Sequence, residues 1–387
     1  MNQAVHTRRN DIDWLRVIAT YLFLVFSAAR VFDADPAYHV KNPEVSGVFS
    51  WLTFFLSQWL PMLFFVLAGW SHRTSLQARK GMESLRERIL RLFVPLVFGC
   101  LLVCPAIVYV ESRQGLPAAA RPSLQAGDAT GSVLPFLQDF FTRLDIFTWA
   151  HLWFLAYLFV FTLVSWPFFS WLLHRKIMPL KIGPGFVYLP MVPLALIRLD
   201  PGVNWPHPGA VFHDQAGLLF FFACFVLGFV ISRYSAYERA MDREYRRAGF
   251  LGAGLLILPL LLAPDPSLPV ISMTGSAAGW CLVVWVMGLA RSRLEHGTVC
   301  PLPLRESTLP VYVLHLLPVV VLGSFLIVPL DAGIAVKFAL LLFLSAGITL
   351  AMYYLGIRRV PALRRLFGMK PEHPSGEHWK DQASNRV

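Results

Sequence analysis

The chain has 387 residues, 56% of them hydrophobic and only 15% charged, and its formal net charge at pH 7 is +11. This composition, with a mean hydropathy of +0.56, excludes an ordinary soluble domain and predicts a protein with many membrane spans. The basic residues lie in short groups between apolar runs, as in the loops of a membrane protein, so we expect no nucleic-acid partner.

Ten apolar segments follow one another along the chain, and each is expected to form a transmembrane helix. They cover residues 14–32, 48–70, 92–110, 151–173, 185–198, 216–232, 248–263, 270–290, 308–329 and 335–356. The fifth and seventh are short, and the fifth contains two prolines, so nine or eleven spans are the alternatives. The predicted fold class is all-α: a polytopic membrane bundle of about ten transmembrane helices.

The distribution of Lys and Arg gives the expected orientation of these spans. With the N-terminus in the cytoplasm, 26 of the 34 Lys and Arg residues fall on the cytoplasmic side and 5 on the opposite side. Because cytoplasmic loops carry an excess of basic residues, both termini are predicted to be cytoplasmic. We expect residues 1–360 to form one transmembrane domain and residues 361–387 a polar cytoplasmic tail.

The first span carries a polar stripe that an ordinary lipid-facing helix would not have. Arg16, Thr20, Ser27 and Arg30 fall on one face of the predicted helix, spread over roughly 20 Å at about 1.5 Å per residue. Ionisable groups within a span are costly and point to a functional site. For Arg30 alone, an arginine that reaches out to the membrane surface is an equally good interpretation.

Two further spans carry histidines. In the ninth span, Thr308, Tyr312 and His315 are spaced so that they share one helix face. His151 precedes Trp153 at the outer end of the fourth span. An aromatic belt at the membrane surface explains a tryptophan at this position but does not explain a histidine.

The sequence predicts neither a metal site nor a permanently bound cofactor. The cysteines show no metal-ligand spacing and no disulfide framework, and four of them fall within spans. The chain also lacks a P-loop, a dinucleotide-binding glycine pattern and a nucleophile-elbow serine.

A series of short motifs resembles the acyltransferase 3 family of integral membrane acyltransferases, and within it the branch of periplasmic glucan succinyltransferases. The resemblance runs from about residue 9 to residue 356. In chain order the motifs are "RRNDIDWLRVIA", "HVKNPEVS", "PMLFFVLAGWS", "LRERILRLFVPLVFG", "HLWFLAYL" and "YVLHLLPVVVLG". Each is weak alone, but their order and spacing together are specific.

The family resemblance implies site residues, and the chain departs from the family at one of them. The family's first span has an arginine followed eleven residues later by a histidine that activates a substrate; here Arg16 matches, but position 27 is Ser. The family's second signature, Arg-x-x-Arg, corresponds to Arg88 and Arg91. The resemblance implies that these arginines hold the phosphates of an acyl-coenzyme A donor at the cytoplasmic side.

The expected function is transfer of a small acyl group from cytoplasmic acyl-CoA to a hydroxyl of a carbohydrate on the outer side of a bacterial inner membrane. Such a reaction needs a base, and a serine alone does not supply one. We expect His151 to be the base ahead of His315, with Ser27 and Arg16 beside it. Trp153, Tyr312 and His315 are expected to contact substrate or donor, and membrane lipid is an expected partner. The alternatives are a catalytically degenerate family member that binds a ligand, and a transporter of a glycan or lipid intermediate.

Overall fold

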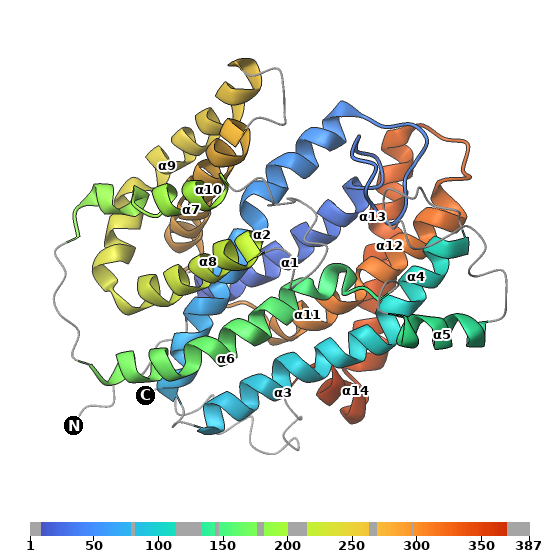
Figure 1. Ribbon diagram of the computed structural model, residues 1–387, viewed down its shortest axis with the longest axis horizontal. Helices are drawn as coiled ribbons and strands as arrows, with labels where there is room; N and C mark the ends of the chain where they lie inside the picture. Colours follow the sequence, from blue (N-terminus) through green and yellow to red (C-terminus); the bar gives the residue numbers. More distant parts are fainter. Residues whose placement is uncertain are drawn as a thin grey trace.

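The computed structural model describes residues 9–78, 82–113, 133–143, 147–175, 182–199, 215–262, 269–295 and 297–369. These residues form α-helices, with a few turns of 3₁₀ or π-helix and no β-strand among them (Figure 1). The predicted all-α fold is therefore confirmed. Of the predicted tail 361–387, residues beyond 369 lie outside the described part of the chain.

The first half of the chain supplies α1 (Asn10–Ala29), α2 (Gly47–Ala78), α3 (Met82–Phe98), η1 (Gly99–Val103), α4 (Cys104–Arg113), α5 (Val133–Thr142), η2 (Ala150–Leu152), α6 (Trp153–His174), η3 (Pro184–Tyr188) and α7 (Met191–Ile197). The second half supplies α8 (Gln215–Arg233), α9 (Ser235–Leu262), α10 (Pro269–Leu294), α11 (Leu302–Leu314), α12 (Leu316–Leu322), η4 (Gly323–Ile327), α13 (Ile334–Ala351), η5 (Met352–Ile357) and α14 (Pro361–Leu366).

Seven helices in the described part are long and apolar enough to cross a membrane, and the number rises to eight if the bent α11–α12 pair is one span. Two of the ten predicted spans do not meet this criterion. The segment 185–198 folds as the short helices η3 and α7, which together are too short for a bilayer core of about 30 Å. The described residues 248–262 of the segment 248–263 are the apolar half of α9, whose other half is rich in charged residues.

Helix α1 lies inside the bundle, where it packs against α2, α10, α11, α12 and α13 (Figure 1). Its polar stripe therefore faces other helices rather than lipid. A charged or hydroxylic side chain in this position has to find a partner within the protein. This central position brings residues from both ends of the chain to the face of α1 that carries Ser27.

Helices α2 and α8 cross at two glycines. A Cβ atom on Gly69 would lie 1.9 Å from the carbonyl oxygen of Phe225, and one on Gly228 would lie 2.0 Å from the carbonyl oxygen of Val66. Each glycine thus admits the backbone of the other helix. Small residues permit this close approach in membrane bundles, where van der Waals packing drives helix association.

The ninth predicted span is broken at His315. Helices α11 and α12 meet there at an angle of 49°. Pro318 explains the break, because its ring lacks an N–H and crowds the carbonyl of Leu314 one turn earlier. The break leaves main-chain carbonyls of α11 open to side-chain donors.

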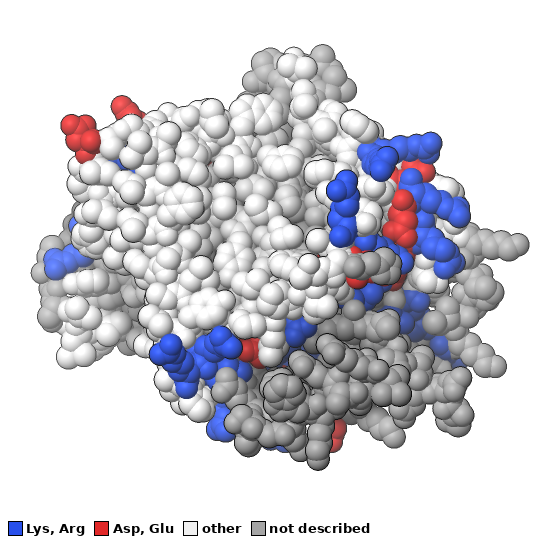
Figure 2. Space-filling view, turned by 180° about the vertical axis from the view of Figure 1, so that it is seen from behind, with Lys and Arg blue, Asp and Glu red and all other residues white. Residues whose placement is uncertain are grey.

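One face of the outer surface lacks charged residues, as expected of a protein in contact with lipid. Figure 2 shows a broad face without charged residues, bordered by groups of Lys, Arg, Asp and Glu. Helix α13 contributes exposed apolar side chains, among them Phe343, which is 73% exposed. This distribution fits a helical bundle that crosses a membrane.

Candidate functional site

Ser27 lies against a histidine, but not the one that the sequence favoured. Its Oγ is 3.1 Å from Nε2 of His315, and both side chains are buried, with 5% and 1% of their surface exposed. The sequence placed His315 nearer the donor side of its span. The bend at the α11–α12 junction instead turns its ring toward the last turn of α1.

The second ring nitrogen of His315 fixes the roles in this contact. Nδ1 lies 2.7 Å from the main-chain oxygen of Tyr312, which can only accept, so Nδ1 carries the proton. In the neutral ring Nε2 is then the acceptor, and the hydroxyl of Ser27 donates to it. This is the geometry of a nucleophilic hydroxyl beside its general base.

His151 lies next to this pair and holds the broken helix. Its Nε2 donates to the main-chain oxygen of Val313 at 2.9 Å, and the hydroxyl of Tyr312 donates to the carbonyl of His151. The rings of His151 and His315 are 5.0 Å apart between centroids. Among the described residues no hydrogen bond joins His151 to Ser27, and Nε2 of His151 instead bonds a carbonyl beside the break.

Two features show that the surrounding structure holds His151 in an unfavourable environment. The residue before it, Ala150, has a φ of +43°, in the left-handed region that side chains other than glycine rarely occupy. Such backbone strain at Ala150 costs about 1–3 kcal/mol and persists only where the surrounding structure enforces it. The Nδ1 atom of His151 is buried and has no hydrogen-bond partner in the described part of the chain.

A cavity of about 250 Å³ opens at the end of α1 that carries Arg16. Helices α1, α2, α3, α6 and α11 line it, and three arginines face it: Arg16, Arg88 and Arg91. Glu87 is the one carboxylate among its lining residues. The structure thus brings the arginine of the first predicted span and the Arg-x-x-Arg pair to one cavity, as the family resemblance implied.

The arginines of this cavity differ in how they are held. Arg16 donates to Oδ1 of Asp13 at 3.2 Å and to Oγ of Ser71 at 2.5 Å, so it has partners within the protein. Nη1 of Arg88 is buried and has no hydrogen-bond partner among the described residues. A buried guanidinium nitrogen without a partner is costly, and an anionic ligand in the cavity would satisfy it.

A closed ring of aromatic side chains ends the cavity on the side of the Ser27–His315 pair. Phe23 contacts Phe64 and Tyr312, and Phe154 contacts the same two rings, with centroid distances of 5.3–6.1 Å. Phe64, Phe154 and Tyr312 line the cavity, whereas Phe23 lies 6.5 Å from the ring of His315. Ser27 and His315 do not line this cavity, but Tyr312, which does, lies 6.0 Å from the ring of His315.

A second cavity, of about 330 Å³, lies at the other end of α1. Hydroxyl, amide, carboxylate and guanidinium groups line much of it: Arg30, Asp33, Asp35, Ser50, Thr53, Ser57, Gln58, Arg198 and Ser272. Hydroxyl-rich molecules are bound by such mixtures of hydrogen-bond donors and acceptors. The two cavities therefore differ in their charged groups: three arginines and one carboxylate line the first, and two arginines and two carboxylates line the second.

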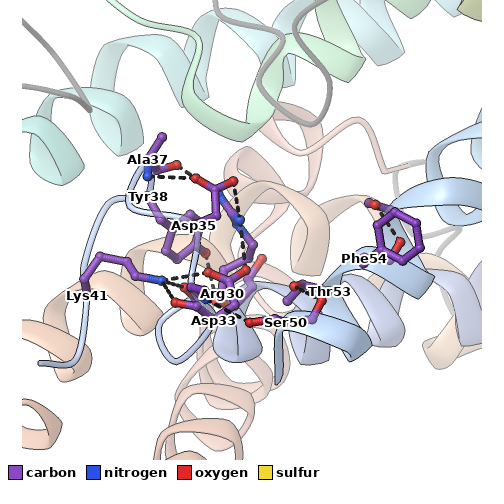
Figure 3. A network of polar contacts seen from close by, with 12 residues as sticks. Arg30, Asp33, Asp35, Ala37, Tyr38, Lys41, Ser50, Thr53 and Phe54 are labelled. Carbon is purple, nitrogen blue, oxygen red and sulfur yellow. Dashed lines mark hydrogen bonds and ion pairs between the residues drawn. The ribbon is translucent and has the colours of Figure 1, made fainter. Parts of the chain in front are cut away.

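A network of polar contacts shapes the wall of the second cavity (Figure 3). Nη1 of Arg30 lies 2.9 Å from both Asp33 and Asp35, and Lys41 donates to Asp33 at 2.7 Å. Burial lowers the pKa of Lys41, and its hydrogen bond to Asp33 opposes that effect. Arg30 is only 4% exposed, so the interpretation that it reaches out to the membrane surface is wrong.

Tyr38 joins this network to Ser27. Its hydroxyl donates to the main-chain oxygen of Ser27 at 2.9 Å, which satisfies one of the last carbonyls of α1. Burial raises the pKa of Tyr38, so the phenol stays protonated and remains a donor. No sequence pattern predicted this contact, because Tyr38 lies in the connection after α1 and not in a span.

Trp153 lies apart from both cavities. It packs in an aromatic cluster with Phe65, Tyr157 and Phe221, at centroid distances of 5.3–6.3 Å. Trp153 lines neither cavity, and its predicted contact with substrate stays a prediction. Tyr312 does line the first cavity, and it also contacts His151 and His315.

Comparison with protein families identifies the chain. The model of the acyltransferase 3 family, described as an acyltransferase domain, matches residues 9–358. The chain belongs to the acyltransferase 3 family. Comparisons with curated proteins and with solved structures returned no match.

Membership of the acyltransferase 3 family confirms the resemblance drawn from the sequence motifs, and it identifies the chain as a membrane acyltransferase. The apolar helices agree with a multi-pass membrane protein. Within this acyltransferase 3 chain, α1 provides Arg16 and Ser27, whereas the imidazole that contacts Ser27 comes from the α11–α12 break.

Proposed function

We propose that this acyltransferase moves a small acyl group from acyl-CoA to a hydroxyl of a carbohydrate, in a bacterial inner membrane. The observation that carries the proposal is the buried, unpartnered Nη1 of Arg88 in a cavity that Arg16 and Arg91 share. Guanidinium groups bind phosphates through charge-assisted hydrogen bonds, and coenzyme A carries its phosphates at the end remote from the thioester. The thioester would then point toward the aromatic ring and Ser27.

The second cavity supports a hydroxyl-bearing acceptor. Its lining of serine, threonine, glutamine and carboxylate groups suits a carbohydrate, which presents hydroxyls that both donate and accept. Donor and acceptor would approach from opposite ends of α1 and meet near Ser27. A small acyl group fits the proposal best, because the rings of Phe23, Phe64, Phe154 and Tyr312 pack against one another between the first cavity and His315.

The donor site is tested by replacing its arginines. We expect Arg88→Ala or Arg91→Ala to weaken binding of acetyl-CoA and succinyl-CoA about tenfold or more, since each loss removes a contact worth about 1.5–3 kcal/mol. Isothermal titration of the purified protein in detergent measures the affinities. Arg88→Lys should recover part of the loss, because lysine keeps the charge but not the planar fork.

Arg86→Ala is the matched control, because Arg86 lies on the same helix, is exposed and does not line the cavity. Equal affinities in Arg86→Ala, Arg88→Ala and Arg91→Ala would mean that the pair only anchors α3 near lipid headgroups. The donor site proposed here would then be rejected.

The proposed route also requires a fixed orientation in the membrane. Reporters placed within 71–91 should read as cytoplasmic, and one inserted at 115–130, which lies outside the described residues, should read as periplasmic. Cysteine labelling from either side of the membrane provides an independent measurement. A cytoplasmic reading at 115–130 would reverse the sides from which donor and acceptor approach.

A further inference from the structure

We infer that Ser27 is a nucleophile that carries the acyl group as a covalent ester between two half-reactions, with His315 as its general base. This inference rests on the proposed function and adds a reaction intermediate to it. The contact of 3.1 Å between Ser27 Oγ and His315 Nε2 carries the argument, together with the bond from Nδ1 to the carbonyl of Tyr312.

The geometry favours Ser27 over the acceptor as the group that His315 deprotonates first. Nδ1 of His315 is committed to a carbonyl, so Nε2 is the only basic nitrogen of that ring. The hydroxyl of Ser27 already occupies this nitrogen. An acceptor hydroxyl would have to displace Ser27 to use the same base, whereas Ser27 needs no rearrangement.

The first half-reaction loads the serine. Ser27 Oγ attacks the thioester carbonyl, and its proton passes to Nε2 of His315. When the tetrahedral adduct collapses, the carbon–sulfur bond breaks and the departing thiolate takes the proton from His315. The products are an ester at Ser27 and free coenzyme A with its thiol, so atoms and charges balance.

The second half-reaction transfers the acyl group from Ser27 to the acceptor. A carbohydrate hydroxyl attacks the ester carbonyl and gives its proton to Nε2 of His315. The ester bond to Ser27 breaks, and His315 returns the proton to Oγ. The serine is regenerated and the acyl group leaves as an ester of the acceptor, so one base serves both steps.

The surroundings of Ser27 suit an ester that must outlast the exchange of substrates. Ser27 and His315 are almost fully buried, and the ring of Phe23, Phe64, Phe154 and Tyr312 separates them from the first cavity. Burial keeps out the water that would hydrolyse the intermediate. A stored acyl group also removes the need for donor and acceptor to be present together at opposite ends of α1.

The experiment is isotope exchange without an acceptor. The full-length protein in detergent is incubated with acetyl-CoA or succinyl-CoA and radiolabelled coenzyme A. An acyl-serine predicts that label enters the acyl-CoA pool, because loading is reversible, and that acid-quenched protein carries the acyl mass on the peptide containing Ser27. Ser27→Ala and His315→Gln should lower the exchange rate by about 10³-fold or more.

Ser27→Cys supplies a second readout. Its acyl adduct would be a thioester, which neutral hydroxylamine cleaves, whereas the serine ester of the unmodified protein resists it. Gel filtration of each variant verifies that the bundle is folded. Acylated Ser27 supports the inference, and so does exchange that Ser27→Ala abolishes.

The negative outcomes separate the two proposals. Protein that binds acetyl-CoA or succinyl-CoA through Arg88, yet shows no exchange and no acylated peptide, overturns the acyl-serine and leaves the donor site standing. Exchange that survives in Ser27→Ala overturns it as well. Loss of binding to both donors overturns the proposed function, and the acyl-serine falls with it.

Discussion

Replacing His315 by glutamine should lower acyl transfer by about 10³-fold or more, whereas the same replacement at His151 should cost less than about tenfold. The two imidazoles have different roles: His315 is a proton acceptor, and His151 is a hydrogen-bond donor. His315 must accept a proton from Ser27, and an amide cannot do so. His151 donates from Nε2 to the carbonyl of Val313, and the amide nitrogen of glutamine can replace that donor.

The variant His151→Ala tests whether His151 acts by holding the broken helix. His151→Ala leaves the carbonyl of Val313 without its partner at the α11–α12 break, and we expect a loss of about 1–3 kcal/mol in stability together with reduced transfer. Rescue by glutamine but not by alanine is the mark of a positioning residue. Release of free thiol from acetyl-CoA or succinyl-CoA, measured with thermal unfolding, distinguishes these effects. Transfer that survives His315→Gln but disappears in His151→Gln would restore His151 as the base.

Replacing Gly228 by valine should disrupt the contact between α2 and α8. The added Cβ alone would lie 2.0 Å from the carbonyl oxygen of Val66, and the obstruction is backbone that cannot turn aside. Overpacking of this kind typically costs about 1–3 kcal/mol, and more where the backbone cannot yield, so we expect a lower unfolding temperature and poorer recovery of folded protein. Thermal unfolding in detergent measures the unfolding temperature, and gel filtration measures the recovery of folded protein.

Gly347→Val is the matched control for this prediction. Gly347 lies on the exposed face of α13, and a Cβ atom there meets no other atom within 4 Å. Gly347→Val should leave the unfolding temperature nearly unchanged, because valine is no worse a helix former than glycine. Equal unfolding temperatures for Gly228→Val and Gly347→Val would show that the crossing of α2 and α8 tolerates more separation than the structure implies.

The helical membrane architecture could be read from the sequence, because long apolar runs have few ways to satisfy their backbone in lipid. The same reasoning was weaker for 185–198 and 248–263, where the apolar run is shorter than a bilayer core. Length and proline content already marked 185–198 as doubtful. The family could also be read from the ordered motifs, and its model covers nearly the whole chain.

The polar stripe of the first span was visible as a helical pattern, since Arg16 and Ser27 fall on one face whatever surrounds them. The residues that contact this stripe could not be predicted from the pattern. Arg30 finds Asp33 and Asp35 in the following connection, and periodicity carries no information about a connection. Only the tertiary structure could therefore distinguish an arginine at the membrane surface from a buried one.

The meeting of Ser27 with His315 shows most clearly what the sequence alone determined and what only the tertiary structure decided. The sequence determined that position 27 holds a hydroxyl where the family has an imidazole, and that Pro318 weakens the helix one turn after Leu314. Ser27 and His315 are 288 residues apart in the chain, and no local pattern links them. Their contact depends on the packing of α11 against α1 and on the direction of the 49° bend at His315. Pro318 permits a bend, but the contacts between the helices decide which way it points.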